Sequence, residues 1–176
     1  MPKPIKLDLP YPSLECVEKD YKTAMIIAPA YASGHSELNS ILQYTYHFFN
    51  FNGIGEKESA KTLMGIAVAE MEHLEILGTL LYKLGADPIY TRRPPYRLDY
   101  YQTSNVSYSK LPVKMLLDNI SGEMLAVKDY QKMVESINNE QVSAVLTRII
   151  LDEELHIKVL KDLLTKYTSS SSIDWW

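Results

Sequence analysis

Apolar side chains recur about every 3.6 residues in four long stretches of the chain, a pattern typical of helices that bury one face. The pattern predicts four helices, at approximately residues 29–51, 56–84, 111–138 and 139–167. Pro29 suits the first turn of the first helix, where its missing N–H costs nothing, and Gly85 suits the C-terminal end of the second. The third and fourth helices follow each other almost without a gap, so the chain must turn back sharply between them.

Three further segments complete the predicted architecture. Residues 85–112 are rich in Pro, Tyr, Arg and Ser and are long for a loop in a compact domain. We interpret them as a crossover between the two ends of a helix bundle. Residues 14–28 predict an additional helix or an extended turn. The sequence therefore predicts an all-α protein with an N-terminal extension at 1–28, a four-helix bundle at 29–167 and a flexible tail at 168–176.

Composition and charge exclude several classes of function. The chain has 176 residues, enough for one domain with a sizeable core. Its formal charge of −4 provides no basic surface for nucleic acid or an anionic membrane, and we find neither a secretory signal nor a transmembrane segment. Cys16 is the sole cysteine, which excludes an internal disulfide and an iron–sulfur cluster held by one chain. We interpret Cys16 as a small buried hydrophobe and expect a reducing, cytoplasmic location.

The two predicted helix pairs repeat one pattern of polar residues. In the first helix of each pair a glutamate precedes a tyrosine by seven residues, and in the second a glutamate precedes a histidine by three. The repeated residues are Glu37, Tyr44, Glu70 and His73 in the first pair, and Glu123, Tyr130, Glu153 and His156 in the second. The surrounding apolar positions match as well, which indicates an internal repeat of a helix hairpin.

These acidic and imidazole residues lie on the apolar faces of their helices. Residues three apart project from the same face, and that face also carries Ile66 and Leu77 in one pair and Ile149 and Leu160 in the other. Four glutamates and two histidines therefore point into one bundle interior, where an unpaired carboxylate costs more than a small domain's net stability. No buried Lys or Arg is patterned to pair with the glutamates. Two divalent cations would balance the charge, as in dinuclear carboxylate sites.

The motifs resemble those of the ferritin-like superfamily. Residues 69–73 (AEMEH) are similar to the second-helix motif of bacterioferritins, and residues 149–156 (IILDEELH) are similar to the fourth-helix motif of bacterioferritins and rubrerythrins. The resemblance covers residues 33–167 and is strongest to the bacterioferritin, rubrerythrin and manganese-catalase branches. It implies a ferritin-like four-helix bundle, with a long crossover between its second and third helices, around two iron or manganese ions.

The resemblance also implies a role for each repeated residue. The implied metal ligands are Glu37 and His73 at one ion, Glu123 and His156 at the other, and Glu70 and Glu153 as bridges. Tyr44 and Tyr130 would orient carboxylates through their hydroxyls or fill the bundle. In manganese catalases the fourth-helix glutamate can act as an outer-sphere base, so Glu153 is also a candidate catalytic base.

The sequence departs from the known branches in specific ways. Rubrerythrins carry an iron domain held by four cysteines, which a single cysteine cannot form, and Ala126 stands where they have an additional glutamate. Bacterioferritins use the methionine after the second-helix glutamate as a haem ligand. Met71 occupies that position. The alternative to a haem ligand is a methionine that packs at a contact between subunits. Manganese catalases have a similarly extended crossover but a longer chain.

Other polar residues predict surface or packing roles. His35 and His47 are interpreted in this way, as is the Arg92-Arg93 pair in the crossover. We interpret a group of further acidic residues as a solvated face: Glu72, Glu75, Asp152 and Glu154. Asp152 is, in addition, placed to support an imidazole N–H.

The resemblance favours an oxidoreductase that uses two iron or manganese ions to dispose of hydrogen peroxide or dioxygen. With iron, a peroxidase would need a separate electron-donor protein, because none is fused to this chain. The alternatives are a ferroxidase subunit of an iron-storage shell, as in bacterioferritin, and a structural metal-binding protein of a coat or assembly. Bundles of this type associate through exposed apolar helix faces, so we also expect a homo-oligomer.

Overall fold

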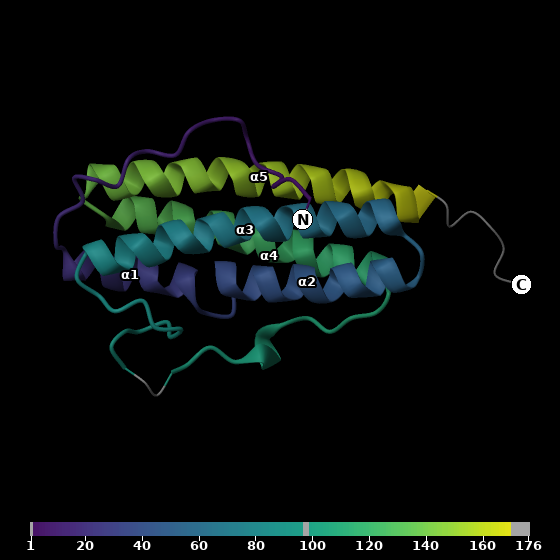
Figure 1. Cartoon of the computed structure of the whole chain (residues 1–176), viewed down its shortest axis with the longest axis horizontal. Coiled ribbons are helices and arrows are strands. Elements are labelled where there is room, and N and C mark those ends of the chain that lie inside the picture. Colours follow the sequence, from purple (N-terminus) through teal and green to yellow (C-terminus); the bar gives the residue numbers. More distant parts are fainter. Residues whose placement is uncertain (1, 97–98, 170–176) are drawn as a thin grey trace, which may run out of the picture.

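Helices arranged in four parallel or antiparallel rows make up the body of the protein (Figure 1). This computed structural model describes residues 2–96 and 99–169. The helices are α1 (Tyr21–Tyr31), α2 (Glu37–Gly53), α3 (Lys57–Lys83), α4 (Pro112–Ser136) and α5 (Glu140–Ser169), with a short 3₁₀ helix at Thr103–Asn105. Within the described residues the extended structure amounts to one isolated bridge between Thr91 and Tyr100. The all-α four-helix bundle is confirmed.

The connections follow the predicted order. Short turns join α2 to α3 and α4 to α5, so each pair forms an antiparallel hairpin (Figure 1). Residues 84–111 then carry the chain from the end of α3 to the opposite end of the bundle, where α4 begins (Figure 1). This crossover runs along α1 and α2, and Tyr101 anchors it there by donating a hydrogen bond from its hydroxyl to Asn39 Oδ1 at 2.8 Å.

The first predicted helix is broken in two, which corrects the continuous helix expected at 29–51. α1 ends at Tyr31 and α2 begins at Glu37, and the two follow each other along one edge of the bundle (Figure 1). Pro29 lies inside α1, near its end, and so does not open a helix. The segment between them is rich in Ser and Gly, which favour caps and turns over helix interiors. Ser36 has extended backbone dihedrals and caps α2 by accepting a hydrogen bond from the Asn39 amide.

The other helix ends lie within two residues of their predicted positions. Gly85 follows the last residues of α3 with φ of +94°, a left-handed conformation that glycine adopts without the steric penalty of a side chain. The predicted tail at 168–176 begins inside α5, which continues to Ser169. The remainder of that tail, residues 170–176 with Trp175 and Trp176, lies outside the described residues.

The N-terminal segment, residues 2–20, passes over α5 before it reaches α1 (Figure 1). Cys16 is exposed in this segment, so the interpretation of Cys16 as a buried hydrophobe is wrong. It lies in an irregular turn on the surface and not on a helix face that packs against the core. In the described part of the chain, no helix combines the length and apolar character needed to cross a membrane.

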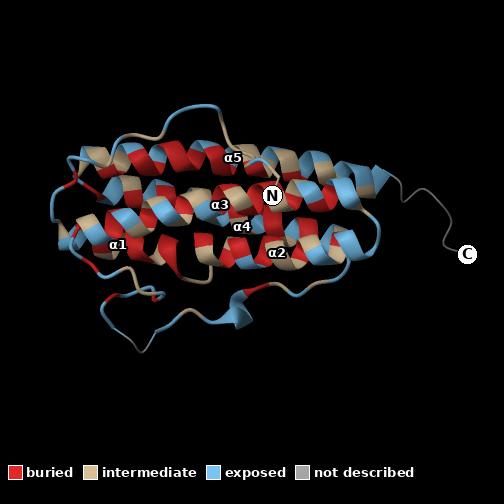
Figure 2. Ribbon diagram, viewed as in Figure 1, coloured by how far each residue is buried: buried red, intermediate tan, exposed pale blue. Residues whose placement is uncertain are grey.

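Two apolar clusters fill the bundle on either side of its middle. Buried residues follow the inward sides of the helices (Figure 2). One cluster joins α1 to the C-terminal part of α3 and includes Ile27, Leu77 and Leu81. The other joins α2 to the N-terminal part of α3 and includes Phe51 and Leu63. The central turns of the helices, which carry the repeated polar residues, therefore lie between two layers from which water is excluded.

We predict that Ser36→Ala lowers the free energy of unfolding by about 1 kcal/mol, because it removes the side-chain acceptor that caps α2. Urea denaturation measures this change. Ser143→Ala, at a position inside α5, is the matched control and should leave stability the same or slightly higher. Equal stabilities for the two variants would contradict the assigned capping role.

Candidate metal centre

Six ionisable side chains meet in the middle of the bundle, and each is at most 3% exposed. They are Glu37 from α2, Glu70 and His73 from α3, Glu123 from α4, and Glu153 and His156 from α5. They form two groups whose potential ligand atoms lie within 4.8 Å of one another, and Glu70 and Glu153 belong to both. The structure thus brings together all six of the residues that the sequence proposed as metal ligands.

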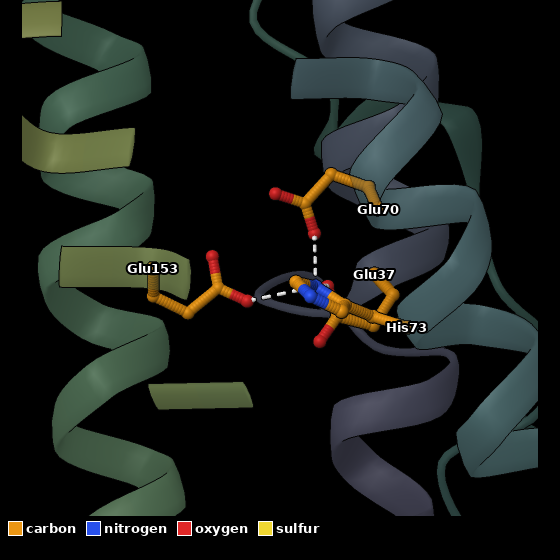
Figure 3. Close-up of side chains that lie close together, drawn as sticks. All are labelled: Glu37, Glu70, His73 and Glu153. Carbon is orange, nitrogen blue, oxygen red and sulfur yellow. Dashed lines mark hydrogen bonds and ion pairs between the residues drawn. The ribbon is translucent and has the colours of Figure 1, made fainter. Parts of the chain in front are cut away.

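Glu70 and Glu153 each direct one carboxylate oxygen to each histidine. His73 Nδ1 lies 3.3 Å from Glu70 Oε2 and 3.1 Å from Glu153 Oε1 (Figure 3). His156 Nδ1 lies 3.0 Å from Glu70 Oε1 and 3.1 Å from Glu153 Oε2. Glu37 belongs to the group that contains His73, and Glu123 belongs to the group that contains His156. A carboxylate with one oxygen on each side is placed to bridge two cations.

Each of the two predicted tyrosines donates a hydrogen bond to a glutamate from the other half of the repeat. The Tyr44 hydroxyl of α2 donates a hydrogen bond to Glu123 Oε1 of α4, and the Tyr130 hydroxyl of α4 donates one to Glu37 Oε1 of α2. Burial and the nearby carboxylate charges raise the pKa of both tyrosines well above their usual range, so both remain protonated donors. Each tyrosine therefore fixes the glutamate of the other half of the repeat.

Burial and the carboxylate charges of this cluster favour bound protons at four of its six groups. Burial and the charges of Glu70 and Glu153 raise the pKa of both Glu37 and Glu123 well above the ordinary value. Burial by itself would lower the pKa of the two histidines, but the surrounding carboxylates raise it well above its usual range. The site therefore demands positive charge, supplied either by bound protons or by cations.

The outward nitrogen of His73 is held by a carboxylate. His73 Nε2 lies 3.2 Å from Asp152 Oδ2, and Asp152 is fully buried, so its interpretation as part of a solvated face is wrong. Burial by itself would raise the pKa of Asp152, but hydrogen bonds from His73, Arg148 and the Leu7 amide lower it. An ionised Asp152 accepts the Nε2 proton of His73 and leaves Nδ1 to face the cluster.

The outward nitrogen of His156 is held by the main chain of the N-terminal segment. His156 Nε2 lies 2.7 Å from the Ile5 carbonyl oxygen, which can only accept, so Nε2 carries the proton. The Ile5 amide in turn donates to the Gly65 carbonyl at 3.0 Å. Both histidines thus present Nδ1 toward the shared glutamates, and in the neutral imidazole that atom has a free lone pair.

The N-terminal segment is the part of the site that sequence reasoning missed. Arg148 is buried and pairs with Asp152 at 2.8 Å, while its Nη2 donates to the carbonyls of Leu7 and Leu9, each at 2.9 Å. The Tyr11 hydroxyl donates to Asp152 Oδ2 at 2.7 Å. Arg148 stands four residues before Asp152 on one helix face, a signal that was available in the sequence. The segment itself has no periodic pattern that could have predicted its position.

The donor atoms of the cluster fit a pair of divalent metal ions. Oε1 of Glu70 and Oε1 of Glu153 are buried without a hydrogen bond of good geometry, although they lie 3.0 Å and 3.1 Å from the Nδ1 atoms of His156 and His73. Buried carboxylate oxygens placed in this way favour a cation in the site. Each group offers one imidazole nitrogen and three carboxylates, a donor set that accepts iron and manganese alike. Among the residues that the structure describes, Arg148 is the one buried Lys or Arg side chain, and it pairs with Asp152 and not with the four glutamates.

The remaining residues singled out in the sequence lie outside the cluster. Met71 is 39% exposed on α3 and borders a surface pocket with Tyr82 and Tyr90. His47 is fully buried, with its ring nitrogens 3.0 Å from Asn119 Oδ1 and 3.0 Å from the Ser107 carbonyl oxygen. It is a packing residue between α2, α4 and the crossover.

Comparison with known proteins places these features in context. The model of the ferritin-like domain family matches residues 34–169. A manganese catalase from Anabaena is similar in structure, with a TM-score of 0.75 and 21% identity over 92% of this chain and 80% of that chain. A bacterioferritin from Rhodobacter capsulatus, with a metal-free dinuclear site and a haem iron, has a TM-score of 0.72 and 22% identity over 86% and 89% of the two chains. No curated protein sequence matches significantly.

We predict that Tyr11→Phe lowers the free energy of unfolding by about 1.5–3 kcal/mol, because a hydrogen bond to the buried Asp152 carboxylate is lost while the ring is kept. Tyr82→Phe is the matched control, since Tyr82 is 75% exposed, and it should leave stability unchanged. Urea denaturation of both variants measures the difference. A Tyr11→Phe variant as stable as the control would show that Tyr11 does not hold Asp152.

Proposed function

Because the chain belongs to the ferritin-like family, we propose that it is a dinuclear metal oxidoreductase that acts on hydrogen peroxide or dioxygen. The observation that carries this proposal is the position of Glu70 and Glu153, each of which reaches toward both histidines with a different oxygen. The donor atoms form two equivalent halves, and each half can bind one metal ion. Peroxide exchanges two electrons, which matches two metal ions that each change oxidation state by one.

The protein's own side chains would hold the ions and control protons. We assign Glu37 and His73 to one ion, Glu123 and His156 to the other, and Glu70 and Glu153 to positions between them. The bound pair would supply the redox change and would bind the peroxide oxygens. Tyr44 and Tyr130 would keep the terminal glutamates in place, and Glu153 would be the candidate base for the proton that peroxide loses on binding.

The identity of the metal decides whether the reaction with peroxide needs an external reductant. With manganese, two molecules of hydrogen peroxide give two of water and one of dioxygen, and no external reductant is consumed. With iron, reduction of peroxide to water requires two electrons from a separate donor protein. The likeness to a manganese catalase and to a bacterioferritin supports a redox function of this class for the dinuclear site and is compatible with either metal.

We predict that the manganese-loaded protein evolves dioxygen from hydrogen peroxide and that Glu70→Ala abolishes this activity. The variant should lose at least one of the two metal ions, because it removes a carboxylate common to both groups. Glu75→Ala, which changes an exposed glutamate five residues along α3, is the matched control. Metal analysis and an oxygen electrode provide the two measurements.

The outcomes of that experiment separate the candidate functions. Full metal content and activity in Glu70→Ala would refute the ligand assignment. Oxidation of Fe(II) with accumulation of ferric mineral in a large assembly, without dioxygen release, would identify an iron-storage subunit instead. Tightly bound metal with neither activity would identify a structural metal site.

We predict that metal binding releases protons and weakens as the pH falls. The pKa values of Glu37, Glu123, His73 and His156 are raised in the metal-free protein by burial or by neighbouring carboxylates. These groups therefore hold protons more tightly than usual, and metal ions must displace those protons. For each proton that metal binding releases, the dissociation constant of the metal increases about tenfold when the pH falls by one unit. Calorimetric titration in buffers of different ionisation enthalpy counts the protons. An affinity independent of pH between about 5 and 8 would contradict the assignment.

A further inference from the structure

A polar pocket of about 210 Å³ opens between α2, α4 and the crossover. Its mouth includes the exposed residues His35 and Asn105, and its inner part includes Gln43, Asn119 and the hydroxyl-bearing Ser107. A water molecule needs only a small fraction of this volume, so several small molecules fit at once. The pocket is therefore large enough for several molecules of water or peroxide.

Two residues of the metal centre are among those that line the pocket. Tyr44 and Glu123 line it, and they are joined by the hydrogen bond from the tyrosine hydroxyl. Glu123 also belongs to the second group of potential ligands. The outward nitrogens of the two histidines, in contrast, are engaged by Ile5 and Asp152. The pocket thus borders the centre on the side of α2 and α4.

A buried amide in this pocket lacks a partner. Asn119 Oδ1 accepts a hydrogen bond from Gln43 Nε2 at 2.9 Å, and Gln43 is fixed in turn because its Oε1 accepts from the Ser107 amide at 2.9 Å. Asn119 is 1% exposed, yet its Nδ2 has no hydrogen-bond acceptor. Such a donor is destabilising unless a small polar molecule accepts from it.

A glycine in the middle of α4 leaves space beside this amide. Gly122 lines the pocket, and a Cβ atom added to it would meet nothing within 4 Å. Glycine inside a helix is destabilising relative to alanine, so local helix stability gives no reason for glycine here. Because Gly122 lines the pocket, a larger side chain at this position would narrow it.

We propose that this pocket is the route by which hydrogen peroxide, or a comparably small uncharged polar molecule, reaches the metal centre, with Asn119 Nδ2 as a hydrogen-bond donor along it. The inference rests on the function proposed above and names the path to the same site. The residues that line the pocket carry little unpaired charge, which favours an uncharged substrate. Asp118 is paired with Lys114 and accepts from the Ser107 hydroxyl at 2.6 Å, and apart from His35 and Glu123 the other lining groups are neutral.

Gly122→Ala and Gly122→Leu test the route in the manganese-loaded protein. We expect a graded loss of kcat/KM for hydrogen peroxide, reaching about tenfold or more for Gly122→Leu, with metal content unchanged and thermal stability of Gly122→Ala equal or higher. Gly53→Leu is the matched control, because a Cβ atom there also meets nothing within 4 Å and the position lies at the far end of α2. It should keep full activity.

A crystal structure provides a readout that does not depend on turnover. We expect an ordered water within hydrogen-bond distance of Asn119 Nδ2 in the unmodified protein and its displacement in Gly122→Leu. Unchanged kcat/KM in Gly122→Leu, or an empty pocket in the unmodified crystal, would overturn the route while leaving the proposed function intact. Failure of the unmodified, metal-loaded protein to consume peroxide would overturn the proposed function and the route together.

Discussion

Carboxylates and imidazoles that are withdrawn from water must have compensating charge within a few ångströms, and this requirement governs the middle of the bundle. Four glutamates and two histidines are buried there, between two apolar clusters that exclude solvent. The buried Arg148 nearby forms an ion pair with Asp152. The cluster is therefore stable when protons or cations supply the missing positive charge. Two divalent ions would balance the charge of the four glutamates.

The surrounding structure holds this cluster at several independent points. The break between α1 and α2 places Glu37 in the first turn of α2, where the helix dipole favours a negative side chain. Tyr44 and Tyr130 cross between the halves and fix the terminal glutamates. The N-terminal segment reaches both histidines, directly through Ile5 and indirectly through Asp152. Each of these contacts orients one of the six residues of the cluster.

The helices and the cluster were predictable because they follow periodic rules. Apolar spacing located α3, α4 and α5 to within about two residues, and the repeat of Glu-x-x-His showed that acidic residues share the buried faces. The break after Tyr31 was missed because Pro29 was interpreted as the start of a helix, although the polar run at residues 33–36 (SGHS) favours a turn and a cap. Asp152 looked like a surface residue because its partners, Leu7 and Tyr11, are remote in sequence and lie in an irregular segment.

The most direct test is a crystal structure of the protein loaded with manganese or iron, with anomalous diffraction recorded at the metal's absorption edge. Two anomalous peaks about 3.5–4 Å apart, both within bonding distance of Glu70 and Glu153 oxygens, are the expected result. A protein that takes up metal but shows no peak in the cluster, or binds it through exposed carboxylates elsewhere, would contradict the account.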